Sequence, residues 1–357
     1  MKKKLVSIFQ VATVFIGTIV GAGLASGKEI TEFFTMYGVN SFLGIIACGI
    51  FYIIMGSIIS KISIDYNLSS YSDVINIISP NILGKFTGFI TTFFLISSAS
   101  IILAGSGALI HQFFGIPQIL GSLIMISIAV FFLLRDTEGL IEVNSFIVPG
   151  LIGTLTLITF LYFSFCKDTI SFSNISNFPP QKSGLAISTI LYAGYNTLSA
   201  SGVLVPLSTQ MKKTKTMIIG VITGAIGLTM LCLMINLLLT VNQPYIYIYE
   251  IPLLFVANRF GNIIQALLLV IIWLEMFSTE VSDIYSISKT LEKSFNLKFK
   301  KAIFIVLGVA LLISQFGFGN LITKLYPMFG LLSLIFISQC IIFFYKHKKD
   351  FSKVSEK

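Results

Sequence analysis

The chain is a series of long apolar runs separated by short polar loops, and this pattern constrains its fold more than any other feature. Of its 357 residues, 55% are hydrophobic and only 11% are charged. Several runs reach the length of about 20 residues that a helix needs to cross the apolar core of a bilayer. A soluble protein could not bury so much apolar surface, so the sequence predicts an all-α polytopic membrane protein.

Ten transmembrane spans fit the alternation of apolar runs and loops. They run over 5–37, 40–62, 83–112, 118–134, 141–165, 184–207, 216–241, 262–289, 302–316 and 320–345. If the N-terminus is cytoplasmic, 19 of the 24 Lys and Arg residues fall on the cytoplasmic side, as the positive-inside rule requires. We therefore predict one transmembrane domain over 1–357 in the cell membrane, with both ends in the cytoplasm. The net charge of +9 then reflects membrane orientation and not a nucleic-acid partner.

The first span is interrupted by glycine in the middle of its apolar run, FIGTIVGAGLASGKEITEFFTMYG (15–38). A backbone break at membrane depth is tolerated only where the freed groups face protein or a wet cavity. Amides at the start of a second half-helix suit a carboxylate, and unwound carbonyls suit a cation. Close packing between helices is the structural alternative for such glycines. The predicted substrate ligands here are Gly21, Ala22 and Gly23, and the predicted ion ligands are Gly17 and Val20.

The sixth span, LYAGYNTLSASGVLVPLS (191–208), also loses its apolar character in mid-course, at 194–197. Each interrupted span is the first of its half, and a polar loop at 167–182 separates the halves. Five spans per half is an odd number, so the second half enters the membrane inverted, as in many secondary transporters. The sequence thus predicts a 5+5 inverted repeat, over about 5–165 and 184–345, with discontinuous helices 1 and 6.

The eighth span carries carboxylates and hydroxyls side by side, in the run EMFSTEVSD (275–283). Hydroxyls in membrane helices usually bond back to the preceding turn. Ionisable groups inside a membrane are costly and mark ion or proton pathways. Glu275 and Glu280 lie about 140° apart around a helix, so at most one lines a cavity with Ser278 and Thr279. Glu280 is the candidate proton-coupling group.

No enzymatic or metal chemistry is indicated. The four cysteines lie within or at the edge of apolar segments and form no CxxC pair. No nucleophile, base and orienting group stand together, as catalysis would require. We expect no enzyme activity, no cofactor, and no metal beyond a sodium ion.

The motifs IGTIVGAGLASGKEITEFFTMYG, AGYNTLSASG and MFSTEVSDI resemble those of the YkvI-like family of bacterial membrane proteins, which is placed among amino-acid permeases. More remotely, the chain resembles the amino acid, polyamine and organocation transporters, which have the LeuT-type fold. The resemblance implies a sodium site between the first and eighth helices. Its ligands would be the carbonyls of Gly17, Val20 and Glu275 and the hydroxyls of Ser278 and Thr279. The neighbouring carboxylates leave proton coupling open.

Together these features lead to the hypothesis of a secondary active transporter of a small amino acid or related zwitterion, coupled to sodium or protons and working by alternating access. The amides of 21–23 would hold the carboxylate. Groups of the sixth span would hold the ammonium; they are Ala193, Gly194, Tyr195 and Asn196. The main alternative is a membrane receptor that senses an amino acid without transporting it. A passive channel is a third hypothesis, against which the paired helix breaks argue.

Overall fold

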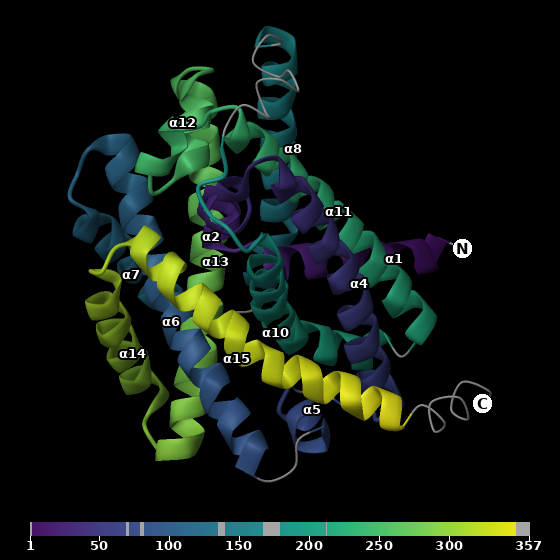
Figure 1. Cartoon of the computed structure of the whole chain (residues 1–357). Coiled ribbons are helices and arrows are strands. Elements are labelled where there is room, and N and C mark those ends of the chain that lie inside the picture. Colours follow the sequence, from purple (N-terminus) through teal and green to yellow (C-terminus); the bar gives the residue numbers. More distant parts are fainter. Residues whose placement is uncertain are drawn as a thin grey trace.

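The computed structural model describes residues 2–68, 71–78, 82–134, 140–166, 179–211 and 213–347, and within these ranges it is built of helices without strands (Figure 1). Ten helices of 16 residues or more lie at the ten predicted spans. They are α1 (Lys2–Ile19), α4 (Ser41–Asp65), α6 (Ile82–Phe114), α7 (Gln118–Leu133), α8 (Leu140–Phe165), α10 (Leu185–Met211), α11 (Thr214–Thr240), α13 (Asn262–Phe295), α14 (Phe299–Ser314) and α15 (Phe318–Lys346). The shorter ones are α2 (Ala22–Ser26), α3 (Lys28–Phe33), η1 (Thr35–Asn40), α5 (Tyr71–Ile78), η3 (Tyr245–Ile248) and α12 (Pro252–Asn258).

Six of the long helices are both long and apolar enough to cross a membrane by themselves: α4, α6, α8, α11, α13 and α15. Two more, α1 and α7, are apolar but shorter. The remaining two, α10 and α14, fall below these limits. In α10 the reason is its place in the bundle. It packs against α15, α4 and α1, so its surface faces protein more than lipid and tolerates polar residues.

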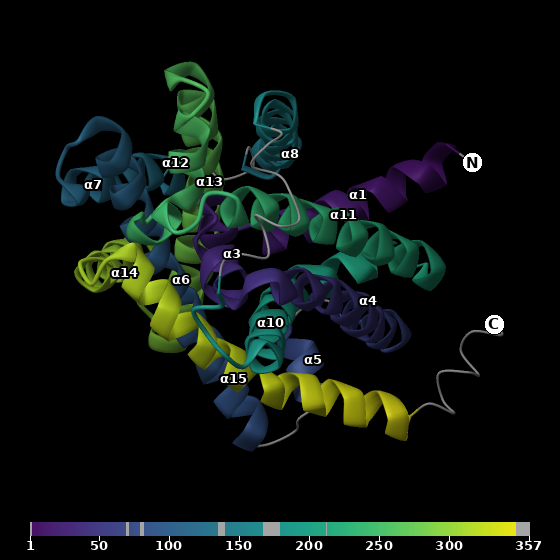
Figure 2. The ribbon, with the colours of Figure 1, turned by 45° about the horizontal axis from the view of Figure 1, so that its top comes forward.

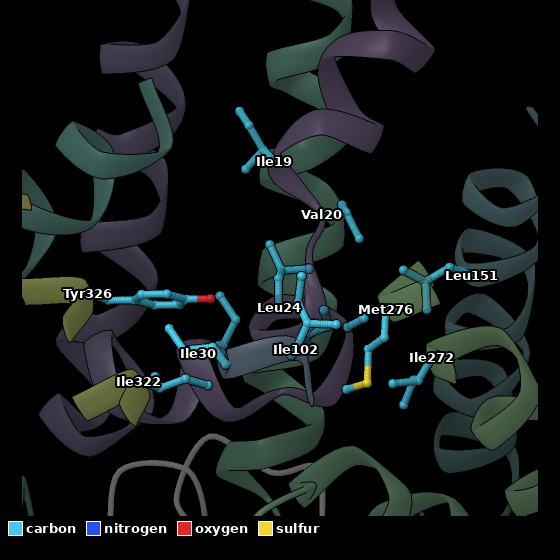
Figure 3. Packing of buried hydrophobic residues seen from close by; sticks show 14 of the residues in the cluster. Ile19, Val20, Leu24, Ile30, Ile102, Leu151, Ile272, Met276, Ile322 and Tyr326 are labelled. Carbon is cyan, nitrogen blue, oxygen red and sulfur yellow. The ribbon is translucent and has the colours of Figure 1, made fainter. Parts of the chain in front are cut away.

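The predicted break in the first span is present. α1 ends at Ile19, Gly21 is extended, with φ −111° and ψ −169°, and α2 is a single turn. A second interruption follows at Gly27, whose φ of +81° is a conformation that only glycine adopts without strain. The first span therefore crosses the bundle in three pieces, α1, α2 and α3, and its ribbon narrows to a coil at Val20 (Figure 3).

The predicted break in the sixth span is wrong. α10 is helical from Leu185 to Met211 and passes through 194–197 without interruption. Two of its polar side chains bond back to the preceding turn of the helix. The hydroxyl of Thr197 donates to the carbonyl of Ala193 at 2.7 Å, and the side-chain amide of Asn196 donates to the carbonyl of Tyr192 at 3.1 Å. Because α10 is continuous, the carbonyls of 193–196 are engaged within the helix.

Gly194 serves close packing between helices. A Cβ there would lie 2.5 Å from the Ser333 hydroxyl of α15, and a Cβ on Gly330 of α15 would lie 2.5 Å from the carbonyl oxygen of Leu191. Small residues at a crossing let two membrane helices approach backbone to backbone. The glycine that predicted a break is therefore explained by the α10–α15 contact (Figure 2).

Contacts between the helices follow a regular scheme. α1 packs along α11 as α10 packs along α4, and α6 lies beside α7 as α13 lies beside α14. Exchanging each helix for the one five spans away in the chain converts each of these contacts into its counterpart. This is the pattern that a two-fold relation between the halves requires, whereas the repeat boundaries stay a prediction. The separating loop lies outside the described residues from 167 to 178.

Candidate functional site

The broken first span places a buried carboxyl group at the centre of the bundle. Glu29 is in the first turn of α3, and its side chain folds back over α2, where a Cβ on Gly23 would lie 2.1 Å from Glu29 Oε1. Only 3% of Glu29 is exposed. The hydroxyl of Tyr195 on α10 donates to Glu29 Oε2 at 2.6 Å. The absence of a side chain at Gly23 is thus what makes room for this carboxyl.

Aromatic rings from three helices surround the carboxyl. Tyr195 stacks on Tyr326 of α15 with ring centroids 4.7 Å apart, and the hydroxyl of Tyr326 approaches Glu29. In Figure 3 this hydroxyl points from α15 toward the first span. Phe33 lies 5.2 Å from the ring of Tyr192 and 6.1 Å from that of Tyr195. We call Phe33, Tyr192, Tyr195 and Tyr326 the aromatic cage.

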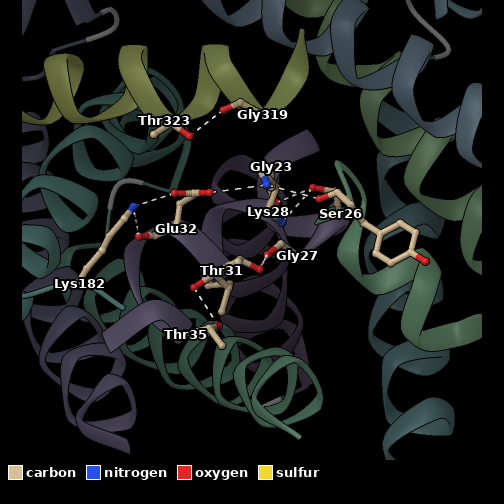
Figure 4. Close-up of polar contacts among 12 residues, drawn as sticks. Gly23, Ser26, Gly27, Lys28, Thr31, Glu32, Thr35, Lys182, Gly319 and Thr323 are labelled. Carbon is tan, nitrogen blue, oxygen red and sulfur yellow. Dashed lines mark hydrogen bonds and ion pairs between the residues drawn. The ribbon is translucent and has the colours of Figure 1, made fainter. Parts of the chain in front are cut away.

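A second acidic residue of α3 carries the nearby ion pairs (Figure 4). Glu32 accepts from Lys182 at 2.8 Å and pairs with Lys28 at 3.6 Å. Lys28 Nζ also donates to the carbonyl of Tyr249 at 3.4 Å. The two lysines therefore direct their charge to Glu32, and no ion pair to Glu29 is formed within the described part of the chain.

A cavity of about 220 Å³ lies between α3, α10 and α15, on the side of the bundle where α3 ends and α10 begins. Glu32 and Lys182 are among its lining residues, as are Phe33, Leu191 and Pro327. Phe33 is one helical turn after Glu29, Leu191 is one turn before Tyr195, and Pro327 follows Tyr326. The cavity thus lies next to the cage, with Phe33 of the cage in its wall.

α13 presents further carboxylates to the interior. Glu280 is fully buried, Glu275 is 3% exposed and Asp283 is 8% exposed. Both oxygens of Glu280 lack a hydrogen-bond partner among the described residues. Ser98 of α6 approaches Asp283. Glu280 and Asp283 are three residues apart, so they lie close together on α13, whereas Glu275, which is also buried, lies about 140° from Glu280 around the helix.

Of the predicted sodium-site residues, Glu275, Ser278 and Thr279 lie on α13, which packs against α2, the turn that follows the break. Val20 is buried in the break, and a Cβ on Gly17 would lie 3.0 Å from Val148 of α8. The hydroxyl of Thr279 donates to the carbonyl of Glu275 at 3.1 Å, the back-bonding expected in a membrane helix. Ser278 is also buried. The sodium site itself stays a prediction.

The predicted substrate ligands of the first span and of α10 lie in the same region, but their surroundings differ. Gly21 has open space where a Cβ would point, whereas Gly23 lies under Glu29. Ala22 is buried in the first turn of α2. On α10, Tyr195 faces Glu29, while Gly194 faces α15.

Two central residues of the site, Glu29 and Tyr326, were not predicted from the sequence. Glu29 was visible as a charge directly after the helix break, and this position is the signal that could have identified it. Tyr326 carries no comparable signal, because only the packing of α15 brings it to Glu29. Glu29 and Tyr195 are 166 residues apart in the chain.

Comparison with solved structures identifies the fold. The structure of Mhp1 in its inward-facing conformation has a TM-score of 0.62, with 14% identity over 96% of this chain and 77% of that one. A Na+-coupled sialic acid symporter gives 0.62, with 16% identity over 91% and 75%. MhsT in complex with L-phenylalanine gives 0.60, with 13% identity over 93% and 90%. The chain has the LeuT-type fold, and none of these proteins is named as an enzyme.

Comparison with sequences identifies the family. No protein-family model matches the chain. The protein YyaD of Bacillus subtilis (strain 168) is 26% identical over 92% of this chain and 94% of its own length. The membrane protein YkvI of the same organism is 30% identical over 335 residues, which cover 93% of this chain and 94% of YkvI. The chain therefore belongs to the family of membrane proteins represented by YkvI.

Proposed function

We propose that this chain is a secondary transporter of a small amino acid or related zwitterion, coupled to sodium or protons. The observation that carries the proposal is the buried Glu29 carboxyl in the broken first helix, bonded to Tyr195 of α10 and approached by Tyr326 of α15. A break at mid-span marks the substrate site of transporters with discontinuous helices. MhsT, of the same fold, is solved with L-phenylalanine.

Unequal packing of the two halves supports alternating access. α10 packs along α15, whereas α1 and α8, the corresponding pair in the first half, touch over a much shorter length. A transporter that alternates between two states needs corresponding contacts that open and close in turn. On this proposal, the structure represents the state in which α10 and α15 are closely packed and α1 and α8 are loosely packed.

The coupling ion is proposed to bind between the first span and α13. Its proposed ligands are Glu275, Ser278 and Thr279 of α13 together with Gly17 and Val20 of the first span, and Glu280 is the proposed proton-coupling residue. A neighbour of the same fold, the sialic acid symporter, is Na+-coupled. Buried carboxylates without a cationic partner are costly, so Glu280 suits a site that a cation visits.

With the termini proposed to be cytoplasmic, the 220 Å³ cavity opens toward the outside. The Glu32–Lys182 pair then stands at the outer entrance of the transport path. The amides near Gly21, whose Cβ direction is open, stay the proposed position of the substrate carboxylate. Because α10 is continuous, the backbone carbonyls of 193–196 are not available to hold an ammonium, and Tyr195 is proposed to contribute through its side chain.

The test is uptake of radiolabelled amino acids by purified protein in liposomes, under a sodium gradient, a pH gradient or neither. Uptake that one gradient drives above equilibrium supports the proposal and names the ion. Binding without any flux would instead support the receptor hypothesis, and uncoupled equilibration would support the channel.

A further inference from the structure

Glu29 carries a buried acidic group that no basic side chain of the described chain neutralises. The lysines nearest in the α3 region, Lys28 and Lys182, both pair with Glu32, at 3.6 and 2.8 Å. Glu29 keeps only hydroxyl partners, of which Tyr195 is bonded at 2.6 Å. A buried carboxylate is stable only when a cation or several hydrogen bonds compensate for its lost hydration. The site therefore favours a ligand that brings a positive charge.

The aromatic cage favours the same kind of ligand. Tyr192 and Tyr195 meet edge to face at 5.5 Å, Tyr195 stacks on Tyr326 at 4.7 Å, and Phe33 lies against both tyrosines of α10. Aromatic faces attract organic cations, and they do so more strongly when water is excluded. The same faces and the carboxyl together repel an anion. A bare sodium ion prefers oxygen ligands to ring faces, so the cage distinguishes an organic ammonium from it.

A cavity of about 220 Å³ lies beside the cage, with Phe33 and Pro327, the neighbour of Tyr326, in its wall. Glu32, three residues after Glu29 in α3, places an acidic residue in the lining of this cavity. This volume admits a small amine and not a peptide.

We propose that Glu29 and the aromatic cage bind the ammonium group of the transported molecule, so that its substrates are small primary amines, zwitterionic or cationic. The assignment rests on the proposed transport function and adds the chemical group that the site requires. Tyr195 contributes its ring to the cage, and its hydroxyl holds the Glu29 carboxyl beside the other rings.

The test is the binding of small molecules to the purified full-length protein in detergent, monitored through the temperature at which the protein unfolds. The probes are L-amino acids from glycine to phenylalanine, each compared with the carboxylic acid that lacks its amino group and with the amine that lacks its carboxylate. We expect the amino acids or the amines to raise the unfolding temperature and the deaminated acids to leave it unchanged. Glu29→Gln, which keeps the shape of the side chain but removes its charge, should lower the affinity for the stabilising compounds by about 25-fold or more.

The control variant is Glu292→Gln, which neutralises an exposed glutamate paired with Lys289 and should bind amines as the parent does. Glu29→Asp, which keeps the charge on a shorter side chain, should bind amines with an affinity between those of the parent and Glu29→Gln. The proposal is overturned if deaminated acids bind as well as amines, if no amine in the series binds, or if Glu29→Gln binds amines like the parent.

The same pairs of compounds, measured as flux in liposomes, separate this inference from the transport proposal. Amine binding that depends on Glu29 without any flux would support the role of the cage and contradict the transport proposal. Coupled flux of molecules without an amino group, unaffected by Glu29→Gln, would support the transport proposal and contradict the role of the cage.

Discussion

Replacing Gly23 by alanine would place a methyl group where the Glu29 carboxyl lies. The added Cβ would be 2.1 Å from Oε1, 2.4 Å from Cγ and 2.6 Å from Cδ of that side chain. An ordinary contact begins near 3.4 Å, so the carboxyl must move by more than 1 Å. Its bond from Tyr195, now 2.6 Å long, cannot be kept in good geometry after such a shift.

The expected cost follows from three effects. Overpacking a filled interior costs about 1–3 kcal/mol, and a lost hydrogen bond costs about 1 kcal/mol more. Alanine in a helical turn recovers up to about 1 kcal/mol relative to glycine. We therefore expect Gly23→Ala to lower the free energy of unfolding by about 1–3 kcal/mol and to weaken amine binding by tenfold or more.

The matched control is Gly308→Ala, in the interior of α14. Its Cβ would meet nothing within 4 Å, and Gly308 lies within a regular helix. Thermal unfolding and amine titration of both variants check the prediction: Gly308→Ala should be no less stable than the parent and bind amines like it, whereas Gly23→Ala should unfold at a lower temperature and bind amines at least tenfold more weakly. Parent-like binding by Gly23→Ala would show that the position of the Glu29 carboxyl does not matter, and would refute the reasoning.

Three further substitutions test other parts of the structure. Gly330→Ala should lower stability by about 1–3 kcal/mol, measured by thermal unfolding, because its Cβ would lie 2.5 Å from the backbone carbonyl of Leu191; an unchanged unfolding temperature would contradict the close α10–α15 contact. Asn236→Leu should cost about 1–3 kcal/mol by the same assay, because Asn236 accepts from the buried hydroxyl of Thr35 at 2.9 Å and donates to the buried hydroxyl of Ser41 at 2.8 Å; a stability equal to the parent's would count against these bonds. Glu280→Gln should abolish the response of uptake to the coupling gradient while leaving amine binding in place, and gradient-driven uptake by this variant would exclude Glu280 from coupling.

Much of the fold follows from the apolar runs in the sequence and from the glycine, proline and charged residues that interrupt them. The end of α7 and the start of α13 were each predicted within one residue, because a glycine, a proline or a charged cluster interrupts the apolar run there. The break at Gly21 was predicted because glycine followed by charge is unusual in a membrane segment. Both inferences use local chemistry, which the sequence contains.

The site was predicted less well, because its decisive contacts are distant in the chain. Gly194 has the same local signal as Gly21, yet its neighbour is Ser333 of α15, and close packing rather than a break is the result. Glu29 gains its role only when α10 and α15 bring Tyr195 and Tyr326 to it. Such an arrangement depends on helix packing, which no local pattern encodes.

The most direct test of the central claim is gradient-driven accumulation of an amine-bearing amino acid in liposomes that contain either the parent or Glu29→Gln, at equal protein content. The account predicts that the parent accumulates the amino acid above its external concentration, that an ionophore abolishes this accumulation, and that Glu29→Gln reaches equilibrium at most. Equal accumulation by the parent and by Glu29→Gln would contradict it.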